Sequence, residues 1–227
     1  MDQPALMTPT APRYPLILAA ALLAGVSFWI GRTHVDEGIA WVAWKGACVA
    51  LLALWAAMNA RNGDGWLITV VMVFGALGDV LLERSQAIGG GAFLAGHLAA
   101  ATLYLRHRRL ARSGSQTMLA VVLAIGIPVI AFLLTRQPLV AVYALGLGAM
   151  AGSAWASSFP RYRVGLGAVM FAASDLLIFA KIGPLATSPL PGMLIWPLYF
   201  LGQSLVAWGA VTTILRWKDN DDLHHRL

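Results

Sequence analysis

The amino-acid sequence predicts an all-α, polytopic membrane protein with eight transmembrane helices. Of its 227 residues, 59% are hydrophobic and only 11% are charged, and the mean hydropathy is +0.73. A soluble domain carries roughly 25% charged residues. The chain also divides into apolar runs of about 17–25 residues, the length that crosses a bilayer as a helix. We therefore expect one compact helical membrane domain.

The spanning helices are expected at about 14–31, 39–60, 65–83, 90–106, 117–135, 138–158, 164–182 and 192–216. The breaks between them carry Arg, Asp, Gly, Ser or Pro, as short interhelical turns do. Only Arg13 precedes the first run and no clear small-residue cleavage site follows it, which favours a helix over a signal peptide. Residues 14–217 would form the membrane domain, with an amino tail at 1–13 and a carboxyl tail at 218–227.

The positive charges predict that both termini are cytoplasmic, because cytoplasmic loops carry the excess of Lys and Arg. The tails and the second, fourth and sixth connections hold Arg13, Arg61, Arg106, Arg108, Arg109, Arg112, Arg161, Arg163, Arg216, Lys218 and Arg226. The opposite side holds Arg32, Arg84, Arg136 and Lys181. The expected location is the cell (inner or plasma) membrane.

Two acidic residues, Asp79 and Asp175, lie inside apolar runs. A carboxyl group in hydrocarbon costs several kcal/mol unless it is paired, protonated or facing a polar cavity, so it indicates a functional site. The alternative is a structural role as hydrogen-bonding glue between helices.

Other polar residues fall at a similar depth. A rise of 1.5 Å per residue places Asp79 roughly 6–7 Å and Asp175 about 10 Å below the outer membrane boundary. The same count places Lys45, His97, Tyr199 and Gln203 roughly 9–15 Å below it. Polar side chains from five helices therefore converge on one layer in the outer half of the bilayer.

The chain also contains a possible internal repeat. Residues 75–82 (GALGDVLL) resemble 171–178 (FAASDLLI), which aligns Asp79 with Asp175, and 93–97 (FLAGH) resemble 199–203 (YFLGQ). Lys45 aligns with Tyr143. This pattern predicts a parallel 4+4 repeat about an axis along the membrane normal, with the two Asp-bearing helices facing each other.

Several other classes of site find no support in the sequence. Cys48 is the sole cysteine, so no disulfide framework and no cysteine-based metal site is expected. The net charge of +6 comes without a basic-aromatic stripe, so we expect no nucleic-acid partner. His224-His225 is too short to indicate a metal site, and no nucleotide-binding or hydrolase motif is present. No metal and no cofactor are expected.

The chain resembles the YhhN-like membrane proteins, a family that includes the lysoplasmalogenases. The matching positions are Lys45, residues 78–82, Phe93-X-X-X-His97, Tyr143, Met150, Gly167-Ala168-X-X-Phe171-X-X-Ser174-Asp175 and Tyr199-X-X-X-Gln203. Two positions depart from the family pattern: Gly46 replaces a usual Pro, and Ala100 replaces a common Tyr.

The resemblance implies hydrolysis of the vinyl ether bond of a lysoplasmalogen, a lysophospholipid in the bilayer, to a fatty aldehyde and a glycerophospho-alcohol. It implies catalytic roles for Asp79, Asp175 and His97, and substrate binding by Lys45, Tyr199, Gln203, Tyr143 and Ser174. The chemistry of the residues agrees with this, because enol-ether cleavage requires a protonated acid and a nearby anion, as two carboxyl groups supply in glycosidases.

Some alternatives stay open at the level of sequence. Either Asp is suited to be the acid, Lys45 is suited to snorkel, to neutralise an Asp or to bind phosphate, and His97 is suited to a structural role. A proton-coupled lipid or solute carrier would also use buried acids, and a structural subunit would tolerate Asn at both positions. The sequence assigns neither a head-group preference nor an oligomeric state.

Overall fold

The computed structural model describes residues 11–224, with side chains through Asp222, and within that part the chain is all-α, as predicted. The elements are α1 (Pro15–Gly31), α2 (Ile39–Asn59), α3 (Gly63–Leu82), α4 (Gln86–Arg106), α5 (Gly114–Thr135), α6 (Pro138–Ala156), the short π-helix η1 (Arg161–Gly165), α7 (Leu166–Lys181) and α8 (Leu190–His224). Seven of the described helical spans, with η1 and α7 taken as one, are long and apolar enough to cross a membrane, and α1 is a shorter apolar helix of 17 residues. Together they make a multi-pass membrane protein.

Local capping explains where helices begin earlier than predicted. The helix expected from 90 begins at Gln86, because the Ser85 side chain accepts a hydrogen bond from the backbone N–H of Ile88. The helix expected from 117 begins at Gly114, where Ser113 and Gln116 form a reciprocal capping box. Polar residues assigned to loops thus belong to the first turns of helices.

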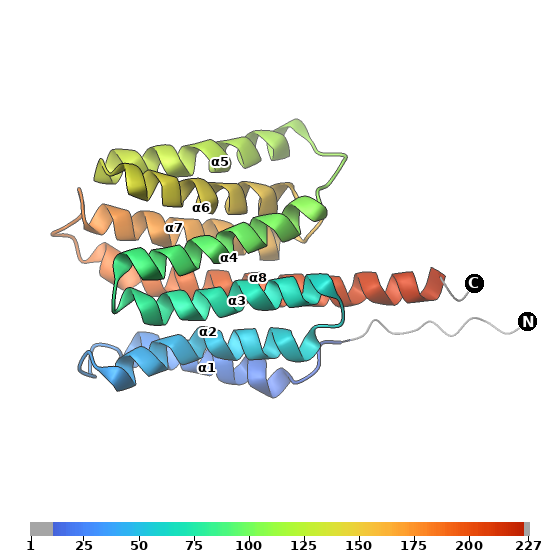
Figure 1. Ribbon diagram of the computed structural model, residues 1–227, viewed down its shortest axis with the longest axis horizontal. Helices are drawn as coiled ribbons and strands as arrows, with labels where there is room; N and C mark the ends of the chain where they lie inside the picture. The colour runs from blue at the N-terminus through green and yellow to red at the C-terminus, as the bar shows by residue number, and fades with distance from the viewer. Residues whose placement is uncertain (1–10, 225–227) are drawn as a thin grey trace, which may run out of the picture.

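Helix α8 differs most from its predicted span of 192–216. It continues through His224, eight residues further, and its end projects beyond the rest of the bundle (Figure 1). Lys218 and Asp222 form an i,i+4 ion pair of 3.7 Å on this extension, a spacing that supports helix in polar sequence. Most of the predicted carboxyl tail is therefore helical, while residues 225–227 and residues 1–10 of the amino tail lie outside the described part.

The connections gather at two ends of the bundle (Figure 1). The α1–α2, α3–α4, α5–α6 and α7–α8 turns lie at one end, and the remaining connections lie at the other with the starts of α1 and α3 and the end of α8. The tightest turn is Arg136-Gln137, where Arg136 takes a left-handed conformation with φ 56° and Pro138 begins α6.

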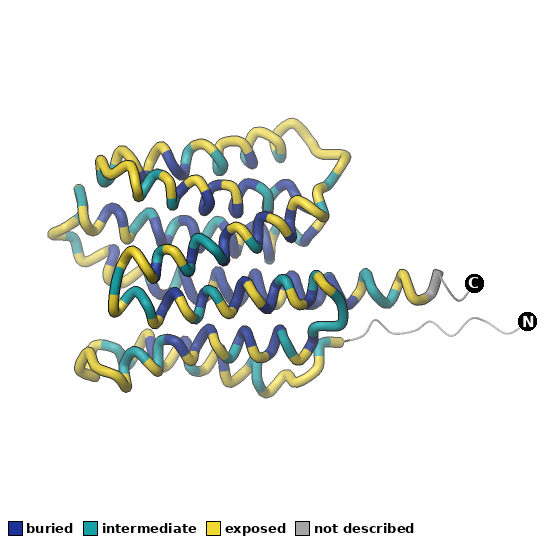
Figure 2. Tube along the Cα trace, viewed as in Figure 1, coloured by how far each residue is buried: buried dark blue, intermediate teal, exposed yellow. Residues whose placement is uncertain are grey.

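The core is formed by α2, α3, α4, α6, α7 and α8, whereas α5 is largely exposed (Figure 2). Sequential helices pack along one another except α4 and α5, since α4 packs on α6 instead, and α8 also contacts α1, α2 and α3. The Asp-bearing helices α3 and α7 do not pack directly on each other in the described chain. The aromatic rings of Phe93 on α4 and Tyr199 on α8 fill the space between them.

Close packing of α7 on α8 fixes the height of the site. A Cβ atom built on Gly167 would lie 2.6 Å from the Gly202 carbonyl oxygen, and one built on Gly202 would lie 2.7 Å from the Gly167 carbonyl oxygen. Only glycine at both positions permits this approach, which is the small-residue packing typical of membrane helices. Asp175 follows two turns after Gly167, and Gln203 is adjacent to Gly202.

Candidate functional site

The first hydrogen-bonded chain of the site ends on Asp175. The Tyr143 hydroxyl of α6 donates to the Asp175 carboxylate of α7 at 2.5 Å, and His97 Nε2 of α4 lies 3.0 Å from the same hydroxyl. Because the single Tyr143 proton goes to Asp175, the Tyr143 oxygen accepts from His97, which must carry its proton on Nε2. The chain therefore runs from His97 through Tyr143 to Asp175, and it leaves His97 Nδ1 as an acceptor.

The second chain ends on Asp79. The Tyr199 hydroxyl of α8 donates to the Asp79 carboxylate of α3 at 2.7 Å, and the Gln203 side chain, one helical turn further, approaches the Tyr199 hydroxyl. Asp79 is 2% exposed and Asp175 is 6% exposed. In each carboxyl group Oδ2 is held by a tyrosine hydroxyl.

Some residues that align between the two halves of the sequence make similar contacts across the bundle. Phe93 and Tyr199, which are equivalent positions, lie edge to face with ring centroids 5.9 Å apart. His97 packs on Phe171 at 5.0 Å, and its equivalent Gln203 lies against Gly75, the equivalent of Phe171. The His97–Phe171 contact thus has a counterpart in the contact of Gln203 with Gly75.

The tyrosines break this symmetry. Tyr199 aligns with Phe93, and Tyr143 aligns with Lys45, so the two hydroxyls reach the two carboxyl groups from non-equivalent helices. Phe93 and Phe171 lie between the two chains, with Phe171 also 5.2 Å from the Tyr199 ring. The layer thus consists of two tyrosine-bound carboxyl groups around a group of aromatic rings.

Lys45 forms an ion pair that the sequence reasoning did not identify. Its ammonium Nζ lies 2.6 Å from Glu83 Oε1 and 5.4 Å from the centroid of the Trp41 ring. Lys45 is also within electrostatic range of Asp79. Glu83 lies one turn after Asp79, on the same side of the helix and at a depth similar to that of Lys45. These two features of the sequence could have identified Glu83 as the partner of Lys45.

Ser174 is adjacent to Asp175 on α7, and its side chain interacts with that carboxyl group. It is 0% exposed, and its hydroxyl donates to the Phe171 carbonyl oxygen at 2.8 Å within its own helix. Its predicted role in substrate binding stays a prediction. Phe93 and Phe171 belong to the family motifs in the sequence, but only the helix packing shows that their rings surround the site.

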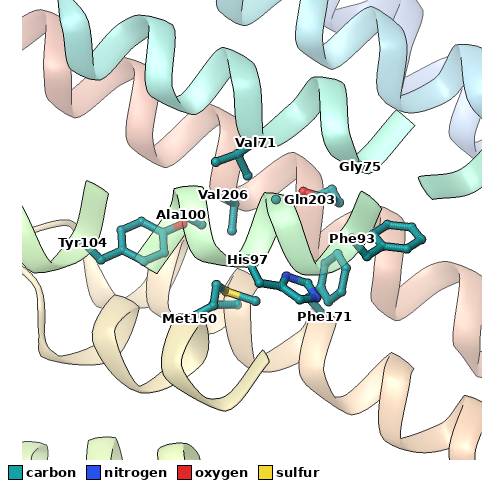
Figure 3. A pocket seen from close by; sticks show the side chains of 12 residues that line it. Val71, Gly75, Phe93, His97, Ala100, Tyr104, Met150, Phe171, Gln203 and Val206 are labelled. Carbon is teal, nitrogen blue, oxygen red and sulfur yellow. The ribbon is translucent and has the colours of Figure 1, made fainter. Parts of the chain in front are cut away.

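A small cavity adjoins this layer inside the bundle (Figure 3). Its volume is about 20 Å³, and His97 and Gln203 line it. The rest of its wall is formed by small and apolar side chains, with Tyr104 at the other end. Its lining comes from α3, α4, α6, α7 and α8, the helices that also hold the two carboxyl groups and their tyrosines.

Within the described residues, no group of three His, Cys, Asp or Glu side chains is arranged to hold a metal ion. The His224-His225 pair lies where side chains are no longer described. The polar groups of the layer are instead paired as acceptor carboxylates and donor phenols.

A sequence model of the YhhN family matches residues 40–210, which spans α2 to most of α8 and includes every residue of the two hydrogen-bonded chains. Neither the curated proteins nor the solved structures contain a match to this chain.

Proposed function

The chain belongs to the YhhN family, and we propose on that premise that it is an intramembrane hydrolase that cleaves the vinyl ether bond of lysoplasmalogens. The products would be a fatty aldehyde and a glycerophospho-alcohol. The observation that carries the proposal is the pair of buried carboxyl groups, each with Oδ2 held by a tyrosine hydroxyl.

The first step is protonation of carbon. A vinyl ether resists base but accepts a proton at its β-carbon, so the C=C π-electrons form the new C–H bond and the α-carbon becomes an oxocarbenium ion. A carboxylic acid in an apolar site is suited to give this proton. The electron-rich faces of Phe93, Phe171 and Tyr199 suit a cationic intermediate.

The second step is water capture. The water oxygen bonds to the α-carbon, its proton passes to the second carboxylate, and the resulting hemiacetal breaks its C–O bond to release aldehyde and alcohol. In this collapse the second carboxyl group gives its proton to the leaving ether oxygen, and the first carboxylate takes the proton of the hemiacetal hydroxyl, so both groups return to their starting states. No redox partner is needed, because the carbons are hydrated and cleaved without a net change of electrons.

The surroundings divide the two roles. Lys45 and its partner Glu83 lie on the Asp79 side of the layer, with Glu83 one turn after Asp79, and a nearby cation favours an ionised carboxylate. Asp175 is bound by the neutral Tyr143 hydroxyl in a wall of aromatic rings. Asp175 is therefore the proposed acid, and Asp79 is the proposed anion and base.

Lys45 is the proposed contact for the lipid phosphate. Its side chain is 15% exposed, and the Glu83 carboxylate that it binds is 29% exposed, at the end of α3 that follows Asp79. A phosphate that binds there replaces Glu83 as the partner of the ammonium group. A single-chain lipid would then carry its enol ether just beneath the head group, in the carboxyl layer.

The decisive experiment uses purified protein in detergent with three lipids: a lysoplasmalogen, its saturated alkyl-ether analogue and a lysophosphatidyl ester. We expect aldehyde from the lysoplasmalogen alone and competitive inhibition by the alkyl ether, which lacks the π-bond that accepts the proton. Cleavage of the alkyl ether would refute the chemistry. Absence of aldehyde in detergent, with lipid or solute movement only in sealed vesicles, would favour the carrier.

We also propose that the site opens toward the non-cytoplasmic leaflet, because the connections rich in Arg lie at the opposite end of the bundle. Single-cysteine variants on a Cys48→Ala background would be labelled in sealed vesicles. Cysteines near Glu83 should react from outside, and labelling of cysteines near Arg216 from outside would overturn this orientation.

A further inference from the structure

The cavity beside the two hydrogen-bonded chains has the size of one water molecule. Its volume is about 20 Å³, and a cavity needs roughly 10–15 Å³ of such space to hold a water. It extends from Phe93 and Phe171, in the carboxyl layer, to Tyr104, two turns after His97 on α4 (Figure 3). A hydrocarbon chain does not fit in this space.

One polar group at the cavity has no protein partner. Among the side chains that the structure describes, the Tyr104 hydroxyl is the one buried oxygen or nitrogen without a hydrogen bond. Tyr104 is 0% exposed, and its hydroxyl points into the cavity (Figure 3). Buried polar groups in folded proteins are bonded to protein or to ordered water, because an unmade bond is costly.

The cavity offers further partners for the same water. His97 lines it, and since His97 Nε2–H is used by Tyr143, Nδ1 is the acceptor that remains. The Gln203 amide also lines it. A buried water usually makes two to four hydrogen bonds. A hydroxyl, an imidazole acceptor and an amide meet that requirement.

We propose that this cavity binds the water that captures the oxocarbenium ion, and that Tyr104 is the residue that positions it. The inference rests on the hydrolysis proposed above. His97 and Gln203 connect the cavity to the tyrosines of both carboxyl groups, so the water lies next to the layer in which the cation forms. Tyr104 itself touches neither carboxyl group.

The chemistry provides a readout that a purely structural role would not change. The cation has two fates: water bonds to its α-carbon, or its β-carbon loses a proton and the starting enol ether returns. When a water molecule is held next to the α-carbon, its addition is faster than loss of the β-proton. When the water site is lost, protonation becomes reversible, and in D₂O the recovered substrate acquires deuterium at the β-carbon.

The test is therefore Tyr104→Phe, assayed in D₂O with mass analysis of the unreacted lysoplasmalogen. We expect unlabelled substrate from the wild type, and β-deuterated substrate with a kcat about tenfold lower from the variant, the size of one lost hydrogen bond. Ala100→Val, which adds methyl groups to the cavity wall, should act in the same way. Tyr162→Phe loses an equivalent hydroxyl at 82% exposure and should behave as wild type. Unlabelled substrate from both cavity variants would overturn the proposal.

Thermal unfolding in detergent tests the water site without activity. If Tyr104 holds a water, Tyr104→Phe should lower Tm by roughly 2–4 °C. If the hydroxyl is unpaired in the folded protein, its removal should leave Tm unchanged or raise it, and the water site is then refuted. A wild type that releases no aldehyde would refute the proposed hydrolysis, and the Tm comparison would still decide the water site.

Discussion

The two carboxyl groups occupy positions that align in the sequence, yet their surroundings differ. Asp79 accepts a hydrogen bond from Tyr199, and the Gln203 side chain approaches the Tyr199 hydroxyl. The Lys45–Glu83 ion pair lies near the end of α3 that follows Asp79. Asp175 accepts from Tyr143, which accepts in turn from His97. The comparison teaches that helix packing supplies two similar acid sites, and that a few non-equivalent side chains make them chemically different.

That difference is what enol-ether hydrolysis needs. Two carboxyl groups in identical surroundings would share one proton equally. A cation near one of them favours ionisation of that group and leaves the proton on the other. The five predictions below test this asymmetry, beginning with the largest effect.

Asp79→Asn and Asp175→Asn should each reduce hydrolysis about 10²–10⁴-fold, since an acid and an anion are both required. Aldehyde release and size-exclusion profiles would be measured together, so that loss of activity is separated from loss of folding. Asp64→Asn is the control, because Asp64 lies at the other end of α3, paired with His107 at 2.6 Å. If either site variant retains more than a tenth of wild-type activity, the two-carboxylate mechanism is wrong.

The roles of the two residues can be separated with small anions. Asp79→Ala removes the anion and should regain activity when formate is added, whereas Asp175→Ala lacks the acid and should not. Rescue of Asp175→Ala alone would exchange the two assignments.

Tyr143→Phe and Tyr199→Phe should each lower kcat about 10–10²-fold, the range expected for one hydrogen bond to a charged or reacting group. Both substitutions keep the ring contacts with Phe179 and Phe171. Tyr14→Phe, at a side chain 43% exposed, is the control. Wild-type turnover in either site variant would mean that its carboxyl group does not need the hydroxyl.

His97→Gln places the same residue type at both equivalent positions of the repeat. A Gln amide can still donate to Tyr143, so we expect kcat to stay within about tenfold of wild type. His97→Ala, which removes the donor, should lose more. A loss for His97→Gln as large as that for Asp175→Asn would instead assign acid–base chemistry to the imidazole.

Lys45→Met should raise KM about fivefold with little change in kcat, since it removes a partly exposed phosphate contact. Glu83→Gln frees the Lys45 ammonium from its ion pair and should lower KM. The Kd of the alkyl-ether inhibitor should follow both changes. If Lys45→Met lowers kcat and leaves inhibitor binding unaltered, Lys45 acts on Asp79 instead.

Much of this architecture follows from the sequence. The helices follow from the length of the apolar runs, and the depth of each polar residue follows from the constant rise of a helix. That is why Asp79, Asp175, His97, Tyr199 and Gln203 could be assigned to one layer before any contact was known. The family membership agrees with the motifs quoted at these positions.

Helix ends were less predictable where a cap or an ion pair decided them. Ser85 and Ser113 begin helices within segments that read as loops, and Lys218 with Asp222 supports a helix in a segment that read as a tail. Each of these helix ends depends on local side-chain contacts, which the hydropathy of the sequence does not reveal.

The depth of a residue, however, gives only its position along the membrane normal. Which side chains contact each other also depends on their positions in the plane of the membrane. The sequence alone does not predict that Tyr143 binds Asp175, that Lys45 binds Glu83, or that the Tyr104 hydroxyl points into a cavity. The rotation of each helix and its choice of neighbours depend on close contacts such as Gly167 on Gly202, made by residues distant in sequence. The composition of the layer was therefore determined locally by helix geometry, while its pairing was decided by packing between helices.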